Sequence, residues 1–513
     1  MAGAEPVLVV GAGPTGLALA CELYRHGVPC RVVEARAQRG TRSKAIAIWP
    51  RVLEIMAGFG AVDAALERGI RLHGAAVWSR GRPTLTFGLG ALSSRYNFGL
   101  VLPQFETEDV LERRLAALGG SVEHGVQCVG VTPTPVGADV RLEHAGGRVE
   151  QVRAAWIVGC DGSASAVRTA AGIGMRQKLE PEGWIAADVR LRTPLEPTAV
   201  NYFLTRGQVL HVVPLRRHAD GLTWRLTLNV GPVRPVPAQW PPERIAAVAR
   251  ERAAVDVEVL DVEWTSAFRV RQGLAERFVA GRVLVAGDAA HVHSPAGAQG
   301  INAGLQDAAN LGWKLALVSR GAAPPGLLDT YDAERRPAAR AVVAATDRVT
   351  RMGTLRPRPA VAVRDWLWRT AVRRGLTDAL LAPAMAGFTQ RHHRSAASPG
   401  RRALRPGAPA AGARLPDADL GDGRRLWDRL PERGFCVLLA GGASLAGPPP
   451  GVPVVAVTEP PAVAALRAEG GAVFVVRPDR YIAMRCRPGA AAAAVAAYFD
   501  AIEEDAACPV RET

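Results

Sequence analysis

A glycine-rich turn near the start of the chain has the residue types and spacing of a phosphate site. The hexapeptide Gly11-Ala12-Gly13-Pro14-Thr15-Gly16 lies between an apolar run at residues 6–10 and a helical pattern at residues 17–26. In such a turn the first glycine allows the tight bend, the second lets the backbone approach a pyrophosphate, and the third lets helix and strand pack closely. The helix N-terminus adds unpaired N–H groups and a partial positive charge.

An acidic residue completes the same unit. Glu34 ends the second apolar run, residues 28–34, eighteen residues after Gly16. At that place a carboxylate receives the ribose hydroxyls of an adenosine, although a surface glutamate at a strand end is the simpler alternative. Strand, turn, helix and strand together predict a dinucleotide-binding unit. On these residues alone, NAD and FAD are both candidates.

Two further motifs lie far from the first. One is Asp161-Gly162-Ser163-Ala164-Ser165-Ala166-Val167-Arg168, which follows an apolar strand predicted at residues 154–159. The other is Gly287-Asp288-Ala289-Ala290-His291, which follows the apolar run at residues 282–286. It continues through Pro295 and Gly297-Ala298-Gln299-Gly300-Ile301-Asn302 into a helical pattern.

In this order and at these separations, the three motifs resemble those of the group A flavoprotein monooxygenases, the aromatic hydroxylases of the p-hydroxybenzoate and phenol hydroxylase type. The likeness is greatest to the longer members, which act on aromatic polyketides, rifamycins and substituted phenols. It covers residues 1–340 with specific motifs and residues 400–513 more loosely.

The resemblance implies FAD as the cofactor, NADPH or NADH as a transient reductant and O2 as a co-substrate. The residues that it places at FAD are Gly11, Gly13, Thr15, Gly16, Glu34, Arg42, Lys44, Gln104, Asp161, Arg168, Asp288, Gly300, Ile301 and Asn302. Most relatives have an arginine where Lys44 stands, so either Lys44 or Arg42 is expected to make that contact. For Arg168, a structural ion pair is a competing interpretation.

The turn from Gly297 to Asn302 is expected to carry the oxygen chemistry. Reduced flavin and its C4a-hydroperoxide bear negative charge near N1, which backbone N–H groups and a helix N-terminus would face. Pro295, Gly297 and Gly300 are therefore expected to surround the flavin and the peroxide, without a universal side-chain catalyst. Ala298 stands where the family usually has a second glycine.

The substrate side rests on fewer signals. Short strands alternate with turn residues from about 180 to 270, which predicts an antiparallel sheet over the flavin. Trp184, Tyr202, Phe203 and Trp224 are candidates to line an apolar substrate pocket, with packing in the core as the alternative. His211 is a candidate acceptor of a phenolic proton, with an ordinary hydrogen-bonded histidine as the alternative.

The predicted fold is α/β, with a Rossmann-like FAD-binding domain, an antiparallel β-sheet substrate domain and a C-terminal thioredoxin-like α/β domain. The FAD-binding domain is expected in three segments, 1–75, 99–180 and 271–345. The substrate domain takes strands from 76–98 and the sheet of 181–270, and a helical connector covers 346–400. The thioredoxin-like domain, 401–513, lacks C-x-x-C and is expected to pack or mediate oligomer contacts.

Within these domains some elements can be placed more closely. The C-terminal pattern predicts strands at 434–440, 452–456, 472–477 and 480–485, with helices at 460–468 and 489–504. Earlier in the chain, the run Tyr331-Asp332-Ala333-Glu334-Arg335-Arg336-Pro337 predicts a helix that stops before the proline.

Composition narrows the function classes further. The net charge of +15 comes without a basic run interleaved with aromatic residues, so no nucleic-acid partner is expected. The seven cysteines have no metal-ligand spacing, which predicts no metal site and a reducing compartment. No apolar run reaches the ~18 residues of a membrane span, so a soluble cytoplasmic protein without a membrane partner is predicted. Self-association as a homodimer is left open.

The function predicted is FAD- and NAD(P)H-dependent hydroxylation of a phenolic or polyketide-type aromatic substrate, in secondary metabolism or antibiotic modification. Baeyer–Villiger insertion or epoxidation by the same fold is one alternative. A non-catalytic flavin- or drug-binding protein is another. A flavin-dependent halogenase is disfavoured because its Trp-x-Trp-x-Ile-Pro pattern is missing. A simple NAD dehydrogenase would purify without flavin colour.

Overall fold

The sheet of the N-terminal domain brings the three motifs to one edge. Its strands lie in the order β18 (Val279–Ala280), β19 (Val283–Val285), β12 (Trp156–Gly159), β1 (Val7–Val10), β2 (Cys30–Glu34) and β8 (Val122–His124). All neighbouring pairs except β18–β19 are parallel. Strands β1, β12 and β19 are each followed by one motif. Because parallel strands share a carboxyl edge, the motifs meet there.

The computed structural model describes residues 7–41, 45–205, 207–232, 240–392, 395–399 and 407–504. In that part of the chain, no helix is long and apolar enough to cross a membrane. The same residues hold no cluster of three or more His, Cys, Asp or Glu side chains that could bind a metal ion.

Both faces of the N-terminal sheet are covered, which is why β1 is buried at every position. On one face Val7 and Val9 pack in a core with residues of α1 (Pro14–Arg25) and α7 (Gly300–Ser319). On the other face, Leu8 and Val10 pack against an antiparallel meander of β9 (Val126–Thr134), β10 (Gly137–His144) and β11 (Val149–Ala154). The remaining elements around this sheet are α2 (Pro50–Gly58), α3 (Val62–Arg68), α4 (Gln104–Ala117) and α5 (Ala166–Ala170), with the 3-10 turns η1 (Gly287–Ala289), η2 (Ala296–Ala298) and η3 (Pro325–Leu328).

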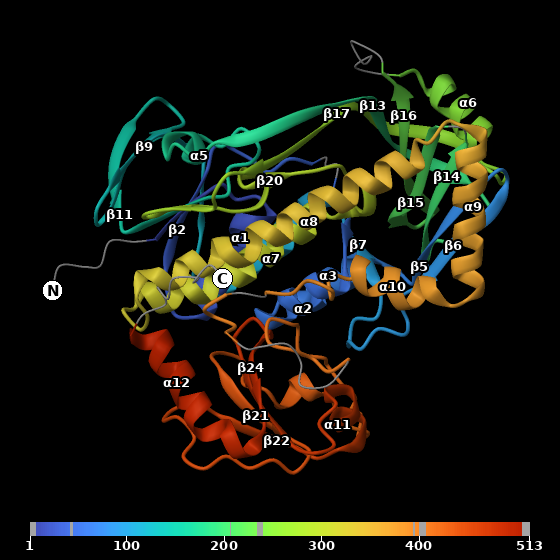
Figure 1. The fold of residues 1–513 in the computed structure, drawn as a ribbon. Helices are drawn as coiled ribbons and strands as arrows, with labels where there is room; N and C mark the ends of the chain where they lie inside the picture. Colours follow the sequence, from blue (N-terminus) through green and yellow to red (C-terminus); the bar gives the residue numbers. More distant parts are fainter. Residues whose placement is uncertain are drawn as a thin grey trace.

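A second, larger sheet lies beside the N-terminal domain (Figure 1). Its eight strands have the order β20 (His291–Val292), β17 (Glu258–Ala275), β13 (Met175–Arg192), β16 (Gly221–Gly231), β15 (Gln208–His218), β14 (Ala199–Thr205), β5 (Gly74–Ser79) and β6 (Arg82–Gly88). All pairs are antiparallel except β14–β5. One face packs on α6 (Pro242–Arg252). A small sheet of β3 (Ala47–Ile48), β7 (Gly99–Val101) and β4 (Ile70–Leu72) joins the two domains.

The connector is helical: α8 (Asp329–Gly353), α9 (Arg358–Arg373) and α10 (Leu376–Met385). The prediction that a helix stops before Pro337 is wrong, because α8 runs straight through this residue. Proline costs one backbone hydrogen bond inside a helix. Here the residues just before it, Glu334 and Arg335, are fully buried and ion-paired, and their contacts hold this stretch of α8 in place.

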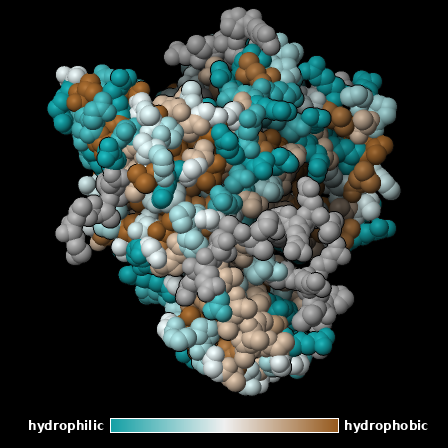
Figure 2. Space-filling model, turned by 60° about the vertical axis from the view of Figure 1, so that its left-hand side comes forward, coloured by the Kyte–Doolittle hydropathy of each residue, from teal (hydrophilic) through white to brown (hydrophobic). Residues whose placement is uncertain are grey.

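The C-terminal domain lies below the N-terminal one in Figure 1. It has a mixed sheet in the order β22 (Val454–Val457), β21 (Cys436–Ala440), β23 (Ala472–Val476) and β24 (Ile482–Cys486), with α11 (Pro460–Leu466), α12 (Ala491–Glu504) and the turns η4 (Leu426–Arg429) and η5 (Pro488–Ala490). These bounds agree with the strands and helices predicted from the pattern. Figure 2 shows a weakly hydrophobic surface over this domain, to which the exposed alanines of α12 contribute.

Candidate functional site

The carboxyl edge of the N-terminal sheet opens into a cleft of about 370 Å³. The residues that line it include five predicted at FAD, namely Gly11, Gly13, Glu34, Gln104 and Asp161. The meander contributes Val126, Gln127 and Cys128. First and second motifs, far apart in the sequence, thus share one cavity.

The three glycines of the first motif have different local requirements. Gly11 has a φ of +101°, and a Cβ there would lie 2.5 Å from the carbonyl oxygen of Cys160. A Cβ on Gly16 would lie 2.0 Å from the carbonyl oxygen of Gly11, so helix and strand need both glycines. A Cβ on Gly13 would meet nothing within 4 Å. The open side of the turn is therefore at Gly13, where the N-terminus of α1 begins, and this is the place for a pyrophosphate.

Glu34 is buried and already linked to the turn. Its carboxylate accepts hydrogen bonds from the Ala12 N–H at 2.8 Å, the Arg36 N–H at 3.0 Å and the Arg36 Nε at 2.8 Å. Burial alone would raise the pKa of Glu34, but the hydrogen bonds from Arg36 and Ala12 bring it below its ordinary value. The carboxylate is thus ionised at neutral pH and able to accept hydroxyl groups at the edge of the cleft.

Asp161 and Arg168 organise the second motif. The Asp161 carboxylate caps α5, accepting from the Ala166 N–H at 2.7 Å and from the Ser165 hydroxyl at 2.5 Å. Arg168 is buried and donates to the carbonyl oxygens of Ala289 and Ser163, each at 3.0 Å. Arg168 therefore ties the second motif to the third through backbone carbonyls. Asp161 borders the cleft, whereas Arg168 is not among the residues that line it.

Asp288 projects from the third motif without a protein partner. Its side chain is exposed, and within the described residues it makes no hydrogen bond or ion pair. The turn that carries it is tightly packed, because a Cβ on Gly287 would lie 2.5 Å from the Thr15 hydroxyl. Thr15 also fills the space beside Gly304 in α7. Thr15 thus packs the glycine-rich turn against the third motif, and Asp288 is left free to bind a ligand.

The turn at the start of α7 has the geometry for anion binding. Gly297 and Ala298 both have positive φ, +74° and +51°. Asn302 fixes the turn, since its amide donates to the carbonyls of Ala47 and Ala298 and accepts from the Trp49 N–H. The first N–H groups of α7, at Gly300, Ile301 and Asn302, have no partner four residues earlier within the helix. Pro295 is exposed just before this turn.

The other cofactor predictions are less informative. Arg42 and Lys44 both lie outside the described residues. Gln104 begins α4 and donates from Nε2 to Glu108 at 2.9 Å, at the margin of the cleft.

The substrate candidates separate onto the two faces of the large sheet. Tyr202 and His211 are cross-strand partners whose rings are 4.4 Å apart, and Trp184 lies 6.1 Å from His211. Phe203 and Trp224 belong to the core on the opposite face, packed with α6, and Trp184 is packed in a separate buried cluster with Leu204, Val209 and Val270. Burial lowers the pKa of His211 to about 4, so its imidazole is neutral at neutral pH. Trp184 Nε1 is buried without a hydrogen-bond partner in the described part of the protein.

His293, near the turn from Gly297 to Asn302, was not among the predicted site residues. A Cβ on Gly300 would lie 3.9 Å from His293 Cε1. Burial lowers the pKa of His293 to about 4, and its Nε2 has no partner among the described residues. The only sequence signal was its place between His291 and Pro295, inside the third motif.

Taken together, these residues fit FAD. The open face of Gly13 suits the pyrophosphate, and Glu34 suits the adenosine ribose. Asp288 is available to a hydroxylated chain, and the turn from Gly297 to Asn302 offers backbone N–H groups to an electron-rich ring.

Known proteins share the FAD-binding domain and the fold of this chain. A family model described as an FAD binding domain matches residues 4–346. The 6-methylpretetramide 4-monooxygenase of Streptomyces rimosus is 39% identical over 354 residues, which cover 68% of this chain and 62% of that protein. The anhydrotetracycline hydroxylase OxyS of the same organism has a solved structure that superposes with a TM-score of 0.78 at 29% identity, covering 98% of this chain and all of that one.

A further relative matches almost end to end. The dialkyldecalin synthase of Streptomyces rugosporus is 31% identical over 509 residues, which cover 96% of this chain and 99% of that protein.

Proposed function

The chain belongs to the group A flavoprotein monooxygenases, whose FAD-binding domain it carries, and we propose that it hydroxylates a phenolic or polyketide-type aromatic compound in secondary metabolism. FAD is the cofactor of this family, and NADPH or NADH and O2 are the proposed co-substrates. The observation that carries the proposal is the meeting of the three motifs at one sheet edge, with Asp288 free beside the turn at the start of α7.

The protein's part in the chemistry is mainly positioning. Bound FAD, once reduced, supplies the activation of O2. The glycine-rich turn and Glu34 fix one end of the cofactor, and the N-terminus of α7 stabilises negative charge at the other. Met385 of α10 lies against this turn, since a Cβ on Gly297 would be 3.5 Å from its Cε. Apolar groups in this position keep water from the reacting atoms.

The substrate is proposed to lie against the face of the large sheet that carries Trp184, Tyr202 and His211. Burial lowers the pKa of His211 to about 4, so its imidazole is neutral and is proposed to accept a hydrogen bond from a phenolic hydroxyl. Drawing the phenolic proton away from the oxygen raises the electron density of the aromatic ring, which favours attack on oxygen. Trp184 Nε1 is a free donor on the same face and would orient a carbonyl or hydroxyl of the substrate.

The decisive test supplies aromatic polyketides and substituted phenols to the FAD-loaded protein with NADPH or NADH under ¹⁸O2. The proposal expects faster nicotinamide oxidation when substrate is present, and a product that carries one ¹⁸O atom on a ring carbon. Insertion of that atom into a carbon–carbon bond, or an epoxide, would favour the related oxygenations instead. Failure to bind FAD would contradict the whole account.

A ring-forming synthase is the second candidate. It is raised by the dialkyldecalin synthase, which is 31% identical over 96% of this chain. A synthase of this kind would form its product at unchanged mass, without consuming NAD(P)H or O2. A protein that only sequesters a flavin or a drug would bind the compound and leave it unaltered.

Two further assignments accompany the proposal. The C-terminal domain is proposed to be a thioredoxin-like module, supported by its mixed four-stranded sheet with α11 and α12. Without a C-x-x-C pair in the sequence it would not carry out dithiol chemistry.

The chain is also proposed to form a homodimer through α9 and α10, which expose Val363, Trp366, Leu367, Leu376 and Leu380. Large apolar groups gathered on one surface usually mark an interface.

A further inference from the structure

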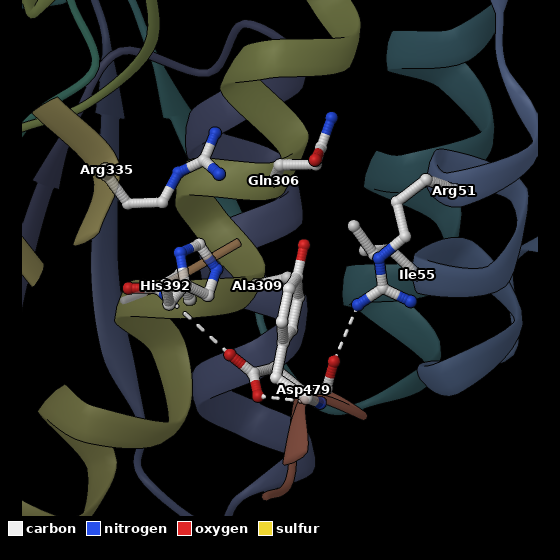
Figure 3. A pocket seen from close by; sticks show the side chains of 9 residues that line it. Arg51, Ile55, Gln306, Ala309, Arg335, His392 and Asp479 are labelled. Carbon is white, nitrogen blue, oxygen red and sulfur yellow. Dashed lines mark hydrogen bonds between the residues drawn. The ribbon is translucent and has the colours of Figure 1, made fainter. Parts of the chain in front are cut away.

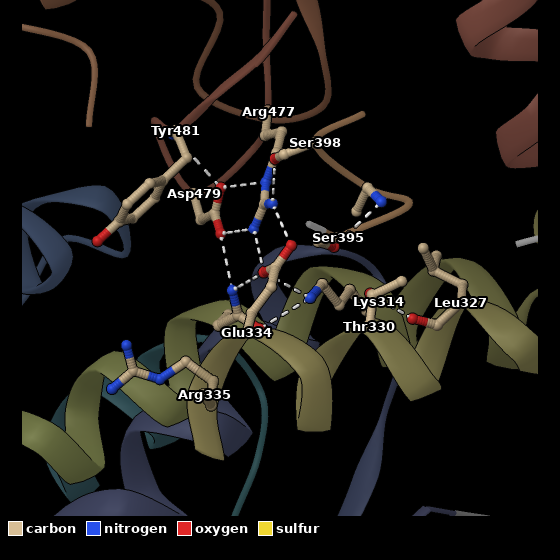
Figure 4. Close-up of polar contacts among 12 residues, drawn as sticks. Lys314, Leu327, Thr330, Glu334, Arg335, Ser395, Ser398, Arg477, Asp479 and Tyr481 are labelled. Atoms are coloured by element: carbon tan, nitrogen blue, oxygen red, sulfur yellow. Dashed lines mark hydrogen bonds and ion pairs between the residues drawn. The ribbon is translucent and has the colours of Figure 1, made fainter. Parts of the chain in front are cut away.

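A buried cluster of charges joins the C-terminal domain to the N-terminal one (Figure 4). Glu334 of α8 accepts from Arg477 Nη1 at 2.6 Å and from Lys314 of α7 at 2.8 Å. Arg477 also donates to Asp479, at 2.6 Å. The four side chains are at most 2% exposed. Arg477 and Asp479 belong to the turn between β23 and β24, so this cluster is one of the contacts through which the C-terminal domain docks.

The cluster is balanced, with two acids and two bases. Burial would raise the pKa of Glu334, yet Arg477 and Lys314 hold it well below the ordinary value. Burial also lowers the pKa of Lys314 to about 8, against the opposing effect of Glu334. Removing one partner would leave an uncompensated charge in the interior, which is strongly unfavourable. The docked position of the C-terminal domain is therefore tied to the ionised state of Glu334.

The next residue along α8 is linked through α7 to the turn that presents Asp288. Arg335 points to a different side from Glu334 (Figure 4) and donates from Nε to Asp307 of α7 at 2.8 Å. Asp307 in turn accepts from the Gly287 N–H at 3.1 Å and bonds to His291 Nε2 at 2.6 Å. Gly287 and His291 are the two ends of the turn that presents Asp288. The buried side chains of Arg335, Asp307 and His291 thus connect α8 to this turn.

The two sets of contacts are in direct proximity. Arg335 and Asp479 line the same small cavity, together with Arg51, Gln306, His392 and Tyr481 (Figure 3). Its volume is about 10 Å³, enough for about one water molecule and far too small for a substrate. Arg51 donates to the carbonyl oxygen of Asp479 at 2.6 Å, which adds a contact from α2. The N-terminal and C-terminal domains are therefore tightly packed against each other in this region.

We propose that Arg335 is a positioning residue for the turn from Gly287 to His291, which presents Asp288. The C-terminal domain, docked through the Glu334–Arg477 cluster, holds Arg335 in place. The domain is then a structural part of the FAD site, although none of its residues lines the cleft at the sheet edge. This inference rests on FAD binding by the family and does not depend on the reaction proposed above.

The test uses full-length protein and measures FAD affinity and the visible spectrum of bound FAD, so it is independent of activity. Arg335→Met is expected to weaken FAD binding about tenfold and to change the flavin spectrum. Arg335→Lys, which keeps the charge, is expected to recover part of both. The double variant Glu334→Gln with Arg477→Met removes one charge of each sign and should weaken FAD binding in the same direction.

Arg424→Met is the matched control, because Arg424 pairs with Asp422 on the exposed surface of the same domain. It should leave affinity and spectrum unchanged. Circular dichroism and thermal unfolding of each apoprotein show whether it is folded. The proposal is overturned if the folded Arg335 and Glu334–Arg477 variants lose only stability and bind FAD with unchanged affinity and spectrum. If Arg335→Met does not fold, Arg335→Lys and the double variant decide the question by the same readouts.

Discussion

Ala298 has a strained backbone conformation in the turn from Gly297 to Asn302. Its φ of +51° is in the left-handed region, which costs an L-residue about 1–2 kcal/mol. We expect Ala298→Gly to keep FAD binding and to change the free energy of unfolding by less than about 1 kcal/mol, since strain relief and added chain entropy oppose each other. Ala298→Val should destabilise by about 1–3 kcal/mol, because a β-branched residue resists this conformation. Chemical unfolding measures both, and equal stability of the Val and Gly variants would refute the strained turn.

His211 is the residue on which the proposed activation of the phenol depends. With its pKa lowered to about 4, His211 is unprotonated throughout the neutral range, but it is a weak base toward a phenol. It would assist proton loss by accepting a hydrogen bond, so His211→Asn should lower kcat for a phenolic substrate by about tenfold or less at pH 7. The deficit should shrink as the pH approaches the phenol's own pKa of about 10, where the substrate ionises by itself. A pH–rate profile parallel to that of the parent enzyme would rule out this role of His211.

Individual site residues were predictable where a local spacing determines their place. Gly11, Gly13 and Glu34 line the cleft because strand, turn and helix leave one arrangement for them. Arg168 was harder, since its partners are carbonyl oxygens of Ser163 and Ala289, and the second is 121 residues away. No side-chain pattern reports such a bond. His293 was missed because a lone histidine gives no periodic signal.

At the scale of elements, the large sheet packs on α6 with one face, and its other face, which carries Trp184 and His211, is the one proposed to meet the substrate. We expect Trp184→Phe to raise KM severalfold, because Trp184 shares a face with His211 and loses its free Nε1 donor. Trp224→Phe is the matched control on the opposite face, packed with α6. It should lower stability by about 1–2 kcal/mol and leave KM unchanged. Steady-state kinetics and thermal unfolding of both variants measure these effects. The same KM change in both variants would contradict the assignment of the two faces.

The faces could not be assigned from sequence, for a physical reason. Tyr202 and Phe203 are adjacent in β14 and so point to opposite faces, but the alternation does not say which face is inward. Cross-strand register decides it, and the pairing of Tyr202 with His211 becomes known only in the folded sheet. Pro337 illustrates the same limit for helices. Local preference predicts a stop there, whereas the buried contacts of Glu334 and Arg335 keep the helix going.

For the whole molecule, the exposed apolar residues of α9 bear on assembly. Its Asp365 is buried and accepts a hydrogen bond from Ser79, while Trp366 and Leu367 are more than half exposed. We expect light scattering after gel filtration to give twice the mass of the chain. Replacing Trp366 and Leu367 by Ser should give the monomer, whereas Leu260→Ser, at another exposed leucine, should not. A monomer in the parent protein would exclude this interface.

The order of the strands and helices that carry the motifs, and of those in the C-terminal region, was largely predictable, because each pattern is local. The contact between the N-terminal and C-terminal domains was not predictable. Glu334 and Arg477 are 143 residues apart, and each resembles an ordinary surface charge in the sequence. Only packing shows that both are completely buried. The inferred role of the C-terminal domain in FAD binding could therefore not be reached from the sequence.

Whether this chain uses FAD to insert an oxygen atom into an aromatic ring is tested most directly by isotope incorporation. FAD-loaded protein, NADPH or NADH and a set of phenols and aromatic polyketides are incubated under ¹⁸O2, and the products are analysed by mass spectrometry. We predict one ¹⁸O atom on a ring carbon, with nicotinamide oxidised in step with product. A product of unchanged mass that forms without NAD(P)H would contradict the proposed hydroxylation and support the ring-forming synthase.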